Sequence, residues 1–209
     1  MNKKNKILNS GLCQGVLKGQ AYFPKENVAK INVKVRTEHK NPKTGKKEIQ
    51  LLNFVAFGEN AEKLEKECAD GDLLMIYYHI ISKIKVDRIT GISRMVIENV
   101  IDDFENYSRD EDNRTPYLNR GFYQGFCLSV TRQPNSEGIY ILDVVSDNSD
   151  VKDRQYFSFT IYGKHGDKIA EAYPRGRRIL IEYKQEKSKR LRRDNSAEFF
   201  TNLVVERIN

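Results

Sequence analysis

The sequence contains no tryptophan, and it has only three cysteines and three histidines in 209 residues. Cys13, Cys68 and Cys127 are odd in number and include no Cys-x-x-Cys spacing, so neither a disulfide framework nor a zinc site is predicted. No apolar run reaches membrane-spanning length, and only Ile7 and Leu8 follow the basic start, too few for a signal peptide. These absences predict a protein of the cytoplasm that uses no metal, cofactor or membrane.

The motifs of common catalytic sites are also missing. There is no phosphate-binding glycine loop, no nucleophile elbow and no metal-binding carboxylate motif. A nuclease would need acidic residues clustered on a basic face, whereas the acidic residues here gather in the stretch 102–112. We therefore predict that the protein is not an enzyme and has no catalytic residues.

What the sequence does have is positive charge and enough apolar residues to fold. The formal net charge is +7, and 39% of the residues are hydrophobic and 10% aromatic. A positive net charge favours a polyanion as the partner, although solvated lysines alone also produce it.

A segment of about 30 residues occurs twice, which indicates an internal repeat. Phe54–Gly58 reappears as Phe159–Gly163, and a helix-like stretch, a glycine and an apolar strand follow both copies. The start of the chain is repeated as well, because Leu8–Gly15 aligns with Leu118–Gly125.

The repeat predicts two domains of similar size. The N-terminal domain covers 1–101 and the C-terminal domain covers 117–209. Residues 102–116 form an acidic linker, which is either simply solvated or able to compete for the binding groove.

The pattern within one repeat predicts a small barrel. Residues 27–37 alternate between apolar and polar side chains, which indicates a half-buried strand. Another strand ends at Gly58, and a helix over 61–69 with Asn60 as its cap precedes two further strands. Five strands with a helix after the third is the order of an OB-fold, which binds oligonucleotides or oligosaccharides. The predicted fold class is all-β, with two tandem OB-fold five-stranded Greek-key barrels, each with a short helix between strands three and four.

One stretch resembles a known family. Asn53–Glu62, followed by a helix, a Gly71-Asp72 turn and an apolar strand, resembles the bacterial single-stranded DNA-binding protein family. Val28–Val33 is similar to the second strand of that family, and Glu98–Val100 is similar to its closing strand. The resemblance covers about the first 100 residues, and the repeat makes the whole chain similar to the tandem-domain branch of the family.

This resemblance implies a non-catalytic protein that binds and protects single-stranded DNA, largely without sequence preference, in replication, recombination or repair. It also implies a homodimer, in which two chains supply four barrels, and a location in the cytoplasm at the nucleoid. The chain departs from the family because it lacks a stacking tryptophan and the acidic, Pro-Phe-ended tail that recruits replication proteins. Recruitment of those proteins is therefore not expected.

The expected site combines cations for phosphates with exposed rings for bases, because counterion release and stacking both favour binding of a single strand. The predicted nucleic-acid-binding residues are Lys30, Asn32, Lys34, Arg36, Asn53, Phe57, Lys83, Lys85, Arg88, Tyr156, Tyr162, Lys184, Lys187, Lys189, Arg190, Arg192 and Arg193. Phe57, Tyr156 and Tyr162 are the expected stacking platforms. The hairpins 83–88 and 184–193 are expected to close over the bound nucleic-acid strand. Each barrel is thus expected to present rings and cations on one curved face.

Other interpretations of these residues stay open. Phe57 and Tyr162 also suit packing against a helix or a partner subunit, and charges on an exposed strand prevent edge-to-edge pairing. The cluster 184–193 also suits RNA or an acidic protein. An OB-fold RNA-binding module or protein adaptor is therefore the alternative function, and stacking with phosphate contacts does not separate DNA from RNA.

Overall fold

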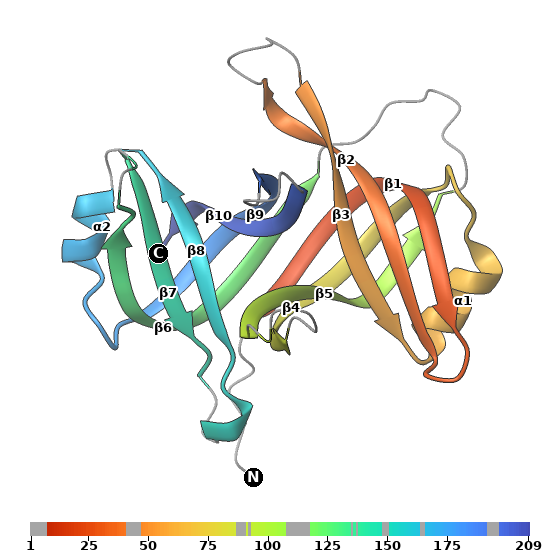
Figure 1. Cartoon of the computed structure of the whole chain (residues 1–209), viewed down its shortest axis with the longest axis horizontal. Coiled ribbons are helices and arrows are strands. Elements are labelled where there is room, and N and C mark those ends of the chain that lie inside the picture. Colours follow the sequence, from red (N-terminus) through yellow and green to blue (C-terminus); the bar gives the residue numbers. More distant parts are fainter. Residues whose placement is uncertain are drawn as a thin grey trace. The chain divides into compact units, whose positions relative to one another are not determined.

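The computed structural model describes residues 8–40, 47–86, 91, 93–107, 118–134, 136, 138–147, 151–163, 166–191 and 197–209 (Figure 1). Strands make up most of these residues, which confirms the predicted all-β class. Within these ranges, neither helix is long and apolar enough to cross a membrane.

The N-terminal barrel contains five long strands and one short helix (Figure 1). They are β1 (Asn9–Phe23), β2 (Val28–Lys40), β3 (Lys47–Phe57), α1 (Glu59–Glu67), β4 (Leu73–Val86) and β5 (Ser93–Asn106). β1 pairs antiparallel with β2 and β4, β2 pairs with β3, and β4 pairs with β5. A parallel β3–β5 pairing closes the ring. This strand order is that of an OB-fold, as the sequence predicts.

The C-terminal barrel repeats these connections. Its elements are β6 (Asn119–Arg132), β7 (Ile139–Val145), the 3-10 turn η1 (Val151–Asp153), β8 (Tyr156–Tyr162), α2 (Gly166–Ala172), β9 (Arg178–Leu191) and β10 (Ala197–Ile208). β6 pairs antiparallel with β7 and β9, and β7 pairs with β8. β10 lies between β8, to which it is parallel, and β9.

The chain divides into two compact units. One unit consists of Ser10–Arg120 and Lys187–Thr201, and the other of Met1–Asn9, Gly121–Glu186 and Asn202–Asn209. Lys187, near the end of β9, therefore belongs to the same unit as β3. β5 continues to Asn106, so residues 102–106 of the predicted linker are strand.

Large side chains from alternating positions fill the interior of each barrel. The rings of Phe54 and Tyr78 meet edge to face, with centroids 5.2 Å apart, in the N-terminal barrel. Phe159 and Tyr183 make the same contact at 5.5 Å in the C-terminal barrel. Edge-to-face contact suits the charge distribution of aromatic rings. Corresponding residues of the repeat thus occupy corresponding places in the two cores.

The start of α1 differs from the prediction. The helix begins at Glu59, and Gly58 is its N-cap with φ of 57°, a conformation that favours glycine. Asn60 is not the cap, because its amide donates a hydrogen bond of 2.9 Å to the backbone carbonyl of Asp102. The sharp turn at Gly58 directly follows Phe57, the last residue of β3.

Candidate nucleic-acid interface

The outward face of β2 and β3 holds most of the residues that the sequence predicts for the N-terminal barrel. Along β2, Ala29, Ile31, Val33 and Val35 are buried, which leaves the intervening positions on the other face. Lys30 and Asn32 are exposed, and Lys34 and Arg36 are half-buried. The cross-strand pairs on this face are Val28–Phe57, Lys30–Val55, Asn32–Asn53, Lys34–Leu51 and Arg36–Ile49.

Phe57 offers an exposed ring at one end of this face. Its side chain is 44% exposed, and the Lys83 ammonium lies 5.8 Å from the ring centroid, within the range of a cation–π contact. A ring that is open to solvent beside a cation can meet a base with its face while the cation meets a phosphate. The structure therefore brings together Phe57 and Lys83, two residues of the predicted set.

Phe23, at the end of β1, is a second exposed ring that sequence reasoning missed. It pairs with Val28 on β2, and Val28 pairs with Phe57 on β3, so the two rings flank Val28 in one row. Strands lie about 4.8 Å apart, which puts Phe23 and Phe57 roughly 10 Å from each other. The Lys30 ammonium lies 5.2 Å from the Phe23 centroid. The signal was available, because a short turn that joins two strands fixes which residues face each other.

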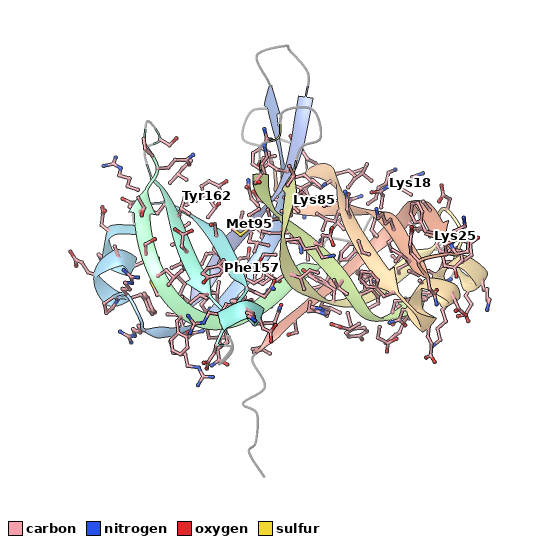
Figure 2. All side chains as sticks on the ribbon, turned by 60° about the horizontal axis from the view of Figure 1, so that its bottom comes forward. Lys18, Lys25, Lys85, Met95, Phe157 and Tyr162 are labelled. Atoms are coloured by element: carbon pink, nitrogen blue, oxygen red, sulfur yellow. The ribbon has the colours of Figure 1, made fainter. Side chains whose placement is uncertain are left out.

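Lys83 and Lys85 share one carboxylate. Glu98 on β5 accepts hydrogen bonds from both ammonium groups, at 2.7 Å from Lys83 and 3.1 Å from Lys85, and its side chain is only 17% exposed. Burial alone would raise the pKa of Glu98, but the two lysines outweigh burial and lower the pKa below its ordinary value. The β4–β5 arm therefore presents less positive charge to a nucleic acid than its lysines suggest. Lys85 projects near the end of β4 (Figure 2).

Lys187 of β9 contacts two side chains of β3, including Asn53 of the predicted binding face. Its backbone N–H donates to Oε1 of Gln50 at 3.0 Å, and its ammonium donates to Oδ1 of Asn53 at 3.3 Å. Burial lowers the pKa of the Lys187 ammonium. This contact adds a cation to the row that contains Asn32 and Asn53.

The outward face of β7 and β8 has rings but a different charge pattern. Tyr156 is 44% exposed and Tyr162 is 49% exposed, at opposite ends of β8. Tyr162 projects near the end of that strand, whereas Phe157 lies among the strands (Figure 2). Burial, and then the charge of Glu186, raises the pKa of Tyr162, against an opposing effect of Lys184.

The cations of β2 have no counterparts on β7. The cross-strand pairs on this face are Ile139–Tyr162, Ile141–Thr160, Asp143–Ser158 and Val145–Tyr156, and none of them includes a lysine or arginine. The cations predicted for this barrel belong instead to the hairpin 184–193, and the side chains of four of them lie outside the described residues. The nearby Lys184 is occupied by two acidic partners, Glu186 at 3.3 Å and Glu206 at 3.5 Å.

Five predicted cations are not placed by the structure. Lys189 and Arg190 lie in β9, but their side chains are outside the description, and Arg88, Arg192 and Arg193 fall outside the described residues altogether. Among the residues that the structure does describe, no group of three His, Cys, Asp or Glu side chains is arranged to hold a metal ion.

Comparison with known proteins places this arrangement among solved structures. No protein-family model matches the sequence, and no curated protein does. The single-stranded DNA-binding protein from Thermus aquaticus superposes with a TM-score of 0.69, covering 97% of this chain and 92% of that one. The chain shares its OB-fold. A deletion mutant of the same protein also gives a TM-score of 0.69 and covers 97% of this chain and 94% of that one. The sequence identities are 12% for the wild type and 13% for the mutant, so the likeness concerns the OB-fold itself.

Proposed function

We propose that this protein binds single-stranded DNA without cleaving it and largely without sequence preference. The observation that carries the proposal is the outward face of β2 and β3, where Phe23 and Phe57 flank Val28 and the cations of β2 continue the same surface. The OB-fold likeness to the Thermus aquaticus protein supports the same interpretation.

The chemistry of this face suits an unpaired strand better than a duplex. Lysines neutralise phosphates and release counterions, which makes affinity depend on salt. Exposed rings stack on bases, and every base offers a face for stacking, so sequence matters little. In a duplex the base faces are covered by their neighbours, so the rings would contribute nothing and only the cations would act.

The biological setting follows from this binding. Protection of an exposed strand is useful in replication, recombination and repair, and we propose that the protein acts there, in the cytoplasm at the nucleoid. A homodimer that supplies four barrels is part of the same proposal.

A titration tests the proposal directly. The full chain is mixed with oligo(dT), oligo(U) or a DNA duplex of equal length while the fluorescence of its 11 tyrosines is followed in rising salt. We expect oligo(dT) to quench the fluorescence, with affinity that falls steeply as salt rises. Equal affinity for the duplex would instead identify a general polyanion binder, and preference for oligo(U) would identify an RNA-binding module. A parallel incubation with magnesium, in which the oligonucleotide stays intact, tests the absence of nuclease activity.

A further inference from the structure

The two barrels place a polar pair at the same position of their outward faces, but the pairs differ in chemistry. The repeat aligns Phe57 with Tyr162, and the strand registers then align the pair Asn32–Asn53 with the pair Asp143–Ser158. The first pair consists of two amides. The second pair consists of a carboxylate and a hydroxyl.

Asp143 is held by two serines. The Ser158 hydroxyl donates to Oδ1 of Asp143 at 2.6 Å, and the Ser129 hydroxyl donates to Oδ2 at 2.9 Å. Each carboxylate oxygen has two lone pairs, so one serine on each leaves acceptor capacity on both. Asp143 is half-buried and Ser158 is exposed, so this capacity borders solvent. The serines fix the carboxylate in place on the outward face.

The surroundings of Asp143 suit bases more than phosphates. Tyr156 and Tyr162 are exposed on the same face, six residues apart on β8, a distance of about 20 Å. At the positions that correspond to Lys30 and Lys34 of the N-terminal barrel, this face has Ile141 and Val145. A strand that lies along it therefore meets two rings and an acceptor between them.

A carboxylate and an amide read base edges differently. An amide both donates and accepts, so an amide pair accommodates any base edge. A carboxylate only accepts. The amino group N4 of cytosine lies at the rim of the base and donates two hydrogens, whereas the single donor of thymine, N3–H, lies between the acceptor oxygens O2 and O4, which repel a carboxylate.

We propose that Asp143 gives the C-terminal barrel a preference for bases with an exocyclic amino group over thymine, while the N-terminal barrel binds bases without such a preference. The inference rests on the proposed binding of single-stranded DNA. A base that lies between those stacked on Tyr156 and Tyr162 donates a hydrogen bond from its amino group to Asp143. The serines hold the carboxylate in position for this contact.

The test is the ratio of affinities for oligo(dC) and oligo(dT) of equal length, measured with the full chain at one salt concentration. Both oligonucleotides carry the same phosphates, so a change of protein charge affects both affinities and largely cancels in the ratio. We expect Asp143→Asn to lower the preference for oligo(dC) on the order of three- to tenfold, the range of one hydrogen bond. The matched variant Asn32→Asp, which puts a carboxylate at the corresponding position of the other barrel, is expected to raise it.

The outcomes separate this inference from the proposed function. If both oligonucleotides bind and neither variant changes the ratio, Asp143 does not read bases, while single-strand binding stands. If the unaltered protein binds neither oligonucleotide, the proposed function itself is wrong. Circular dichroism checks the fold of each variant. If Asp143→Asn does not fold, the ratio for the unaltered protein decides, because equal affinities for oligo(dC) and oligo(dT) would overturn the inference.

Discussion

Gly11 on β1 lies against the ring of Tyr78 on β4, so closely that a Cβ on Gly11 would come within 2.1 Å of Cζ of that ring. The C-terminal barrel has the same relationship, because a Cβ on Gly121 would come within 2.2 Å of Cζ of Tyr183. Both tyrosines are buried core residues. In each barrel, a glycine on the first strand thus leaves the space that a large tyrosine ring fills in the interior.

The first prediction concerns this contact. Gly11→Ala should lower the free energy of unfolding by about 1–3 kcal/mol, because the added methyl group forces the Tyr78 ring or the backbone to move. Urea denaturation followed by circular dichroism measures the change. Ser10→Ala is the matched control, since Ser10 is the exposed neighbour on the same strand and should stay within about 0.5 kcal/mol of the unaltered protein. Equal stability of the two variants would show that the ring has room to shift.

A second prediction concerns stacking on Phe57. Phe57→Ala should weaken binding of oligo(dT) by about 1–3 kcal/mol, the range for one stacked base, and leave unfolding nearly unchanged because the ring is exposed. Tyr107→Ala is the control, because Tyr107 is 53% exposed and lies beyond the end of β5. If Phe57→Ala unfolds the barrel, the ring supports the core; if both variants bind equally, Phe57 does not stack.

The third prediction concerns the cations of β2. Lys30→Ala and Lys34→Ala should each reduce the slope of log affinity against log salt by about 1, because each lysine neutralises one phosphate. Lys63→Ala removes the same charge from an exposed position on α1 and should leave the slope nearly unchanged. An equal effect of all three variants would mean that net charge, rather than this face, sets the affinity.

The shared carboxylate leads to a fourth prediction. Glu98→Gln should strengthen binding of oligo(dT) and steepen its salt dependence, since it removes the negative charge that both Lys83 and Lys85 contact. The same titration in rising salt measures both quantities. Weaker binding would indicate that Glu98 holds the two lysines in the geometry that meets phosphate.

The fifth prediction concerns pH. Because the pKa of Glu98 in the folded protein is lowered from its ordinary value of 4.5, its ionised form stabilises the fold above that value. The stabilisation should disappear as the pH falls through the lowered pKa. The difference in unfolding free energy between the unaltered protein and Glu98→Gln should therefore shrink below about pH 4.5. A difference that stays constant down to pH 3 would contradict this.

The fold could be predicted from the sequence because the relevant signals are local and occur twice. The alternation of Ala29, Ile31, Val33 and Val35 identifies the buried face of β2, and burial in the structure agrees. The repeated motif around Phe54 and Phe159 identifies equivalent core strands. The helix start was harder to predict, because the Asn60 side chain donates to Asp102, which lies far away in the sequence.

The site was less predictable because its charges depend on partners distant in sequence. Nothing in the pattern around Lys83 and Lys85 shows that Glu98 lies across the hairpin and contacts both. Likewise, Phe23, Val28 and Phe57 can be placed in one row only if the register of β1 with β2 and that of β2 with β3 are both known. Sequence patterns show which way a side chain points, but the partner on the neighbouring strand decides how much charge it offers.

The replacement of Lys30 and Lys34 by Ile141 and Val145 at the corresponding positions has a consequence for how this protein can evolve. In an assembly of identical one-barrel chains, a single codon change alters every barrel at once. Here the duplicated segments are encoded separately, so one copy can acquire a new role while the other keeps the original.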